Sequence, residues 1–128
     1  MADRIKLVAN DTRPQIICSL QTSAGVAIDC TAAQSVKLFF RQEGVTTLLA
    51  TLTGVLLTGY LNSDGTITTT APYNVAGAGG RVSFSWGSGT LNVAAGNYEG
   101  EVQITFQDGT IQTVYDLLKF KVRSDIGS

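Results

Sequence analysis

The stretch that decides the fold of this chain is GNYEGEVQITFQDG, residues 96–109, in which two kinds of side chain alternate. Its apolar or small residues share one parity: Tyr98, Gly100, Val102, Ile104 and Phe106. Successive side chains of a β-strand point to opposite faces, so the stretch predicts a strand with one buried face and one wet face. Asp108-Gly109 then predicts a hairpin turn, whose positive φ angles suit Gly and Asp.

The wet face of this strand carries two carboxylates, Glu99 and Glu101, with Asp116 farther along the chain. Paired carboxylates are candidates for acid–base chemistry such as glycoside hydrolysis. A general acid needs a raised pKa, which requires burial or a close like charge. Because the polar parity offers no apolar wall that would desolvate them, we expect both glutamates to be hydrated surface groups. A catalytic pair is the alternative.

Other short segments with strand character recur at spacings near ten residues, with turn residues between them. They are residues 5–8, 15–21, 36–41, 47–53, 55–61, 66–70, 82–86, 111–114 and 118–122. No segment has the sustained 3.6-residue apolar period of an amphipathic helix. The sequence therefore predicts an all-β protein, a single antiparallel immunoglobulin-like β-sandwich over residues 1–128. The apolar face changes phase between Ile111 and Leu118, which predicts a bulge or kink near Tyr115 and Asp116.

The composition excludes several classes of chemistry. The chain has no histidine, which removes Ser-His-Asp and Cys-His catalysis and histidine-ligated metal sites. Cys18 and Cys30 are the only cysteines, too few for a four-cysteine zinc site within one chain. We expect two small buried thiols, and a disulfide between them stays open. No nucleotide-binding or metal-binding motif is present, so we expect no cofactor, no metal and no enzymatic activity.

The charge distribution gives no reason to expect nucleic acid or a membrane as a partner. The net charge is −1, and the nine Lys and Arg residues are scattered along the sequence. Residues 119–123 interleave basic and aromatic side chains, but Phe120 points away from the basic row by parity, so stacking and phosphate contacts would lie on opposite faces. Residues 44–63 are uncharged and leucine-rich, yet their threonines and glycines disfavour a membrane-spanning helix.

A low charge content instead suggests contact with other proteins. Only 15% of residues are charged, whereas the chain has 16 threonines. An uncharged surface loses less solvation free energy when a partner covers it, although threonine is also simply a good strand residue. The run from residue 71 to residue 80 predicts a mobile or partner-ordered loop. We name Tyr60, Pro72 and Tyr73 as candidate anchors of a partner interface.

Several segments, in the same order along the chain, resemble the N-terminal domain of the baseplate upper protein of tailed bacteriophages. They are KLVANDTRPQ (6–15), IDCT (28–31), VKLFFR (36–41), VAAGNYEGEV (93–102), FQDG (106–109), QTVYD (112–116) and FKVR (120–123). We expect structural roles for the residues of the matching motifs: Gly96, Tyr98, Gly100, Glu101, Asp108, Gly109, Tyr115 and Asp116.

The resemblance implies an immunoglobulin-like sandwich that works as a non-enzymatic adaptor in a virion, assembled from protein made in the host cytoplasm. Its partners would be other phage structural proteins, in a homo-oligomer or symmetric array of the tail or baseplate. The sequence ends at Ser128, so the resemblance does not extend to a receptor-binding module, and about residues 54–80 form an inserted hairpin or loop. A capsid decoration (cement) protein on the phage head is the alternative. A carbohydrate-active tail protein that uses Glu99, Glu101 or Asp116 is the less favoured one.

Overall fold

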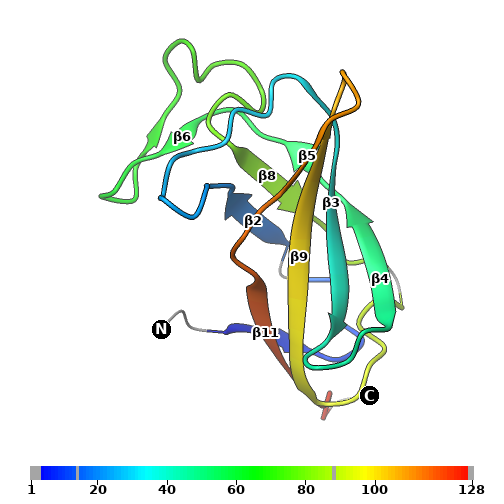
Figure 1. Ribbon diagram of the computed structural model, residues 1–128. Coiled ribbons are helices and arrows are strands. Elements are labelled where there is room, and N and C mark those ends of the chain that lie inside the picture. Colours follow the sequence, from blue (N-terminus) through cyan, green and yellow to red (C-terminus); the bar gives the residue numbers. More distant parts are fainter. Residues whose placement is uncertain (1–3, 14, 88, 127–128) are drawn as a thin grey trace.

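The computed structural model describes residues 4–13, 15–87 and 89–126, and these ranges contain strands and turns but no helix (Figure 1). The strands are β1 (Ile5–Val8), β2 (Ile16–Ser19), β3 (Ala33–Gln42), β4 (Leu48–Thr53), β5 (Val55–Leu56), β6 (Tyr60–Leu61), β7 (Ile67–Thr68), β8 (Arg81–Phe84), β9 (Gly96–Phe106), β10 (Ile111–Thr113) and β11 (Leu118–Arg123). The all-β prediction is therefore confirmed.

Two sheets face each other across one core. The larger sheet has the order β1-β11-β9-β3-β4, and β10 also pairs with β9. The smaller sheet has the order β2-β8-β5, and β6 and β7 form a separate two-stranded hairpin beside it (Figure 1). This is a β-sandwich within a single domain. The finer immunoglobulin-like arrangement stays a prediction.

One strand pair departs from the antiparallel prediction. β1 runs parallel to β11, with Ile5 opposite Phe120 and Val8 opposite Arg123, whereas every other pair of named strands is antiparallel. Parallel neighbours need a long crossover rather than a tight turn. Here almost the whole domain is the crossover, because β1 and β11 are the first and last strands. Alternation of side chains carries no information about this direction of pairing.

The strand predicted from residues 96–109 is the centre of the larger sheet. β9 pairs with β3 on one side and with β11 and β10 on the other. The turn that follows it is also confirmed, with Gly109 at a φ of 87°. Asp108 does not share the positive φ; its carboxylate instead accepts hydrogen bonds from the backbone N and Oγ1 of Thr110, at 3.0 and 2.6 Å.

The phase change near residue 115 appears as a break between two strands. Thr113 at the end of β10 lies opposite Gln103, and Leu118 at the start of β11 lies opposite Gly100. Four residues on this side therefore face only two on β9, which is the geometry of a bulge. The kink predicted near Tyr115 and Asp116 is confirmed.

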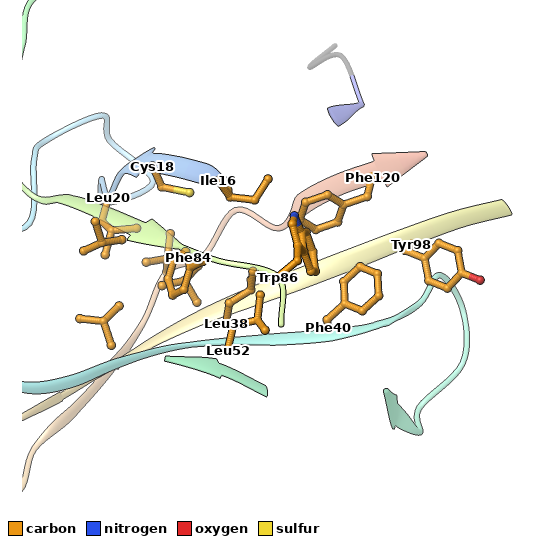
Figure 2. Close-up of a cluster of buried hydrophobic side chains, with 14 of the residues drawn as sticks. Ile16, Cys18, Leu20, Leu38, Phe40, Leu52, Phe84, Trp86, Tyr98 and Phe120 are labelled. Atoms are coloured by element: carbon orange, nitrogen blue, oxygen red, sulfur yellow. The ribbon is translucent and has the colours of Figure 1, made fainter. Parts of the chain in front are cut away.

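The core lies between the β2–β8 layer and the β3–β9 layer, where Figure 2 shows the buried side chains interleaving. Phe40 is at the centre of its aromatic part. The ring centroid of Phe40 lies 5.1 Å from that of Trp86, 5.2 Å from Tyr98 and 5.5 Å from Phe120. Aromatic pairs at such distances contribute about 0.5–1.5 kcal/mol each beyond the area that they bury.

Cys18 and Cys30 are free thiols in or beside this core, which confirms the prediction of two buried cysteines. Burial raises the pKa of each thiol to about 11, and the charge of Asp29 adds to the effect at Cys30. Because the thiolate is the reactive form of cysteine, both groups are inert at neutral pH.

The glycine-rich end of the 71–80 run is packed, so the prediction of a mobile loop is wrong there. Leu20 donates its backbone N–H to the oxygen of Gly80 at 2.7 Å, and Cys30 donates to Gly77 at 2.8 Å. A Cβ atom on Gly79 would lie 2.1 Å from the oxygen of Gly59. Glycine occurs here because backbones touch, and that is a tertiary requirement which composition alone does not distinguish from flexibility.

Candidate functional site

The outer face of the larger sheet carries a row of ion pairs across three strands. Glu99 of β9 lies opposite Arg41 of β3 on one side and Lys119 of β11 on the other. Its Oε2 accepts a hydrogen bond from Arg41 Nε at 2.7 Å, and its Oε1 accepts one from Lys119 Nζ at 3.0 Å. Glu99 is only 5% exposed. The prediction of a hydrated Glu99 is wrong, because two long cationic side chains from neighbouring strands cover its carboxylate.

These partners also set the protonation of Glu99. The hydrogen bond from Lys119 is the largest influence and holds the pKa of Glu99 below its ordinary value; burial acts in the opposite direction, and Arg41 lowers the pKa further. A general acid at neutral pH needs a raised pKa. The geometry of Glu99 is that of a structural carboxylate that is ionised at neutral pH.

The ion-pair row continues toward the N-terminal end of the described chain. Glu43 accepts a hydrogen bond from Arg4 Nη2 at 2.7 Å, and its Oε2 lies 3.7 Å from Lys119 Nζ. Lys119 therefore lies between two carboxylates, and each of these acids also has a second cation: Arg4 for Glu43 and Arg41 for Glu99. We call the set Arg4, Arg41, Glu43, Glu99 and Lys119 the ion-pair row.

A shallow hollow of about 230 Å³ opens beside this row. Its lining is Phe39, Arg41, Leu48, Glu99, Glu101 and Leu117. The face therefore does have apolar neighbours, contrary to the prediction from parity alone. Glu101 itself is exposed, as predicted, and lies opposite Phe39. Glycoside hydrolysis uses two carboxylates on opposite walls of a cleft. Glu99 and Glu101 instead project from the same strand.

The second feature is an apolar projection, which we call the lobe and define as residues 58–76. It holds the β6–β7 hairpin, in which Leu61 lies directly opposite Ile67, and both side chains are exposed, at 43% and 40%. Val75 is also exposed, and Asp64 is the only charged residue of the lobe. The lobe stands outside both sheets, at the upper left of Figure 1.

The predicted anchor residues come together in this lobe. The rings of Tyr60 and Tyr73 lie 5.0 Å apart and tilted by 32°, and both residues are half-buried, whereas Pro72 is exposed. Sequence reasoning missed Leu61 and Ile67. Both residues belong to a run with almost no charge, which could have indicated an exposed apolar surface. The leucines of the neighbouring strands made this run resemble ordinary core strands.

The lobe is held by hydrogen bonds within it and by one from Arg81 of β8. Gly59 donates its backbone N–H to the oxygen of Tyr73 at 2.8 Å, which closes the base. Arg81 Nη1 donates to the oxygen of Thr58 at 2.7 Å, and Asn62 Nδ2 donates to Thr68 Oγ1 at 2.8 Å. The predicted insertion of about residues 54–80 includes β5, an edge strand of the smaller sheet, together with the lobe, and stays a prediction.

Two residues of the expected motif stabilise the core. A Cβ on Gly100 would lie 2.6 Å from Leu38 Cδ1, so glycine is required where β9 passes under the core. Tyr98 is buried against Phe40 and donates its hydroxyl to the oxygen of Ala94, and burial raises the pKa of this phenol. Gly96 begins β9 opposite Val122.

The remaining motif residues lie at the surface. Tyr115 is 80% exposed in the kink between β10 and β11. Asp116 is exposed and lines a different hollow, of about 140 Å³, that Cys18 also lines. The structure therefore does not bring Asp116 into the hollow that Glu99 and Glu101 share.

Within residues 4–13, 15–87 and 89–126, no group of three or more His, Cys, Asp or Glu side chains could hold a metal ion. Over the same ranges no helix is long and apolar enough to span a bilayer. No family model matches the chain, and no curated protein or solved structure is significantly similar to it.

Proposed function

We propose that this chain is a non-enzymatic structural protein of a bacteriophage particle, an adaptor of the tail or baseplate that binds other phage proteins. The resemblance of its sequence motifs suggests the phage context. The lobe is the observation that carries the binding role, because a hairpin with an apolar face and a single charge projects from an otherwise well-packed sandwich. Apolar patches on a soluble domain are typical of protein interfaces.

The contact would rest on Leu61, Ile67 and the Tyr60–Tyr73 pair. Leu61 and Ile67 form one continuous apolar surface, since they are cross-strand neighbours. The tyrosines support it from within the lobe and offer rings whose side-chain freedom is already restricted. Covering such a surface releases about 25 cal/mol per Å² of apolar area, and little charge has to be desolvated.

Shortening the lobe tests this role. Gly59 and Tyr73 are joined by a hydrogen bond, so residues 61–72 can be replaced by a short glycine-serine linker while the packed glycines stay intact. We expect the shortened protein to fold but to be depleted from purified particles in a complementation experiment. Ile111→Ser is the control, because Ile111 is an exposed apolar residue on β10, away from the lobe, and at 60% it is even more exposed than Leu61 and Ile67. Normal occupancy of the shortened protein would show that the lobe is not the docking surface.

The place in the particle is a separate question. A self-contained sandwich also suits a decoration protein that cements capsid subunits of the phage head. Cryo-electron microscopy of particles that carry a labelled copy distinguishes the two sites: we expect density in the tail or baseplate. Density restricted to the icosahedral shell would replace the adaptor role by the decoration role.

A carbohydrate-active role is the second candidate function, because the hollow beside Glu101 combines two carboxylates with the aromatic ring of Phe39. We expect no turnover of host surface polysaccharide by the purified protein. Activity that disappears in Glu101→Gln and persists in Asp116→Asn would establish an enzyme instead, since Asp116 lies outside this hollow.

A further inference from the structure

A patch of positive charge lies at the β1 edge of the larger sheet. The parallel pairing places Lys6 of β1 directly opposite Lys121 of β11, and Val8 opposite Arg123. Opposed residues of paired strands share a face, so Lys6, Lys121 and Arg123 project together; we call these three residues the basic corner. All three are exposed, and with Leu7 and Val8 they line a hollow of about 250 Å³.

The basic corner differs from the cations beside it. Arg4, Arg41 and Lys119 are matched by the carboxylates of Glu43 and Glu99. In the part of the chain that the structure describes, no acidic side chain lines the hollow of the basic corner. Like charges directly opposite each other on neighbouring strands are destabilising. The isolated domain therefore carries an electrostatic cost at Lys6 and Lys121 that an external anion would relieve.

We propose that the basic corner binds an extended acidic segment of a partner protein. β1 is the last strand of its sheet in the described ranges, so one side of its backbone is open to strand addition. Alternate residues of an added strand would lie about 6.5–7 Å apart on one face. Lys121 and Arg123 are themselves alternate residues of β11 and repeat at the same interval. An added strand would lie beside β1, so its glutamates or aspartates at every second position would face Lys6 directly, and the long side chains of Lys121 and Arg123 would reach toward them from the next strand, about 10 Å away.

Nucleic acid fits this surface less well. Tight binding of a phosphate backbone uses a longer row of cations, and single strands also need aromatic rings on the same face. Phe120, the aromatic residue between the cations of β11, is fully buried on the opposite face. The proposal uses a different edge of the molecule from the lobe and does not depend on the adaptor role.

A titration followed by amide chemical shifts tests the proposal. The probe is a short peptide of alternating glutamate and threonine, and the matched control peptide has glutamine in place of each glutamate. At about 20 mM salt, where surface charges are weakly screened, we expect saturable shifts on β1 and β11 with the acidic peptide only. A single-stranded thymidine oligonucleotide is the third probe. Absence of saturable shifts, equal binding of the neutral peptide, or tighter binding of the oligonucleotide would overturn the proposal.

The double variant Lys6→Gln/Lys121→Gln isolates the charge. We expect about three- to tenfold weaker peptide binding, since each exposed ion pair contributes modestly. Lys37→Gln is the control, because Lys37 is exposed on the same sheet but lies opposite Gln103 and Thr53. Without peptide, the double variant should melt about 1–2 °C higher than the wild type because the repulsion is gone. Unchanged peptide affinity or a lower melting temperature would contradict the proposal.

Discussion

The ion-pair row consists of charged side chains and the lobe exposes apolar ones. The two regions differ in how completely contacts within the domain cover or neutralise these side chains. In the row, Glu99 is enclosed by Arg41 and Lys119, so the charges are balanced within the domain. In the lobe, Leu61 and Ile67 keep 43% and 40% of their area exposed to solvent. A buried carboxylate with both of its cations in place has a structural role within the domain. An exposed apolar surface on an ordered hairpin instead indicates a surface that binds another protein.

The largest expected effect concerns the attachment of the lobe to the sandwich. Gly79→Ala would force a methyl group against the oxygen of Gly59, so we expect a loss of at least about 2–3 kcal/mol in the free energy of unfolding. Gly65→Ala is the control, because a Cβ there meets no atom within 4 Å and only the positive φ of 88° is strained, at about 1–2 kcal/mol. Urea unfolding gives both values. Equal losses would mean that the base of the lobe is not packed as described.

The next largest effect is expected when a substitution removes the negative charge of Glu99 at the centre of the ion-pair row. Glu99→Gln leaves Arg41 and Lys119 without their shared anion, and we expect a loss of about 1–3 kcal/mol. Glu101→Gln should change stability by less than about 0.5 kcal/mol, because Glu101 is exposed and has no ion-pair partner in the described ranges. Chemical unfolding at neutral pH compares the two variants. A larger loss for Glu101→Gln would reverse the assignment of the structural carboxylate.

The pH dependence of stability follows from the same carboxylate. The pKa of Glu99 in the folded protein lies below its ordinary value of 4.5, so its stabilisation is complete above pH 4.5 and is lost as the pH falls through the folded-state pKa. The pKa of Glu43 is also lowered, chiefly by its hydrogen bond to Arg4, and this acts in the same direction. Melting curves recorded down to pH 3 should fall more steeply for the wild type than for Glu99→Gln. Parallel curves would exclude Glu99 as a source of the acid sensitivity.

The smallest expected effect is in the lobe. The double variant Leu61→Ser/Ile67→Ser should lower the free energy of unfolding by only about 1 kcal/mol, because both side chains lie at the surface and keep 43% and 40% of their area exposed in the folded protein. The same variant should lose incorporation into particles, as the shortened lobe does. Thermal unfolding and particle occupancy are measured together, and a large drop in stability would show that these residues are part of the core instead.

Local patterns predicted the parts of the fold that depend on one strand at a time. The alternation through Tyr98 and Val102 gave the central strand, and Asp108-Gly109 gave its turn. The phase change also located the kink. These features depend on neighbours in sequence, and sequence shows such neighbours directly.

The parts that failed depend on residues far apart in sequence. Arg41 covers Glu99 from 58 residues away, and Lys119 does so from 20 residues away. Lys6 lies beside Lys121 only because β1 pairs with β11. The apparent mobility of Gly77 to Gly80 was contradicted by the backbones that press against them. Such features depend on which strands pair and in which register, and the sequence of one strand alone does not determine either.

The parallel pairing of β1 with β11 has a consequence for how the protein is made. During synthesis β1 emerges before all the other described strands and its neighbour β11 emerges after them, so this edge of the larger sheet cannot close until residues 118–123 have left the ribosome. Until then the apolar side of Leu7, which is buried in the finished domain, has no β11 to pack beside. Ribosome-bound fragments that end before residue 118 would therefore keep this first strand open to proteases.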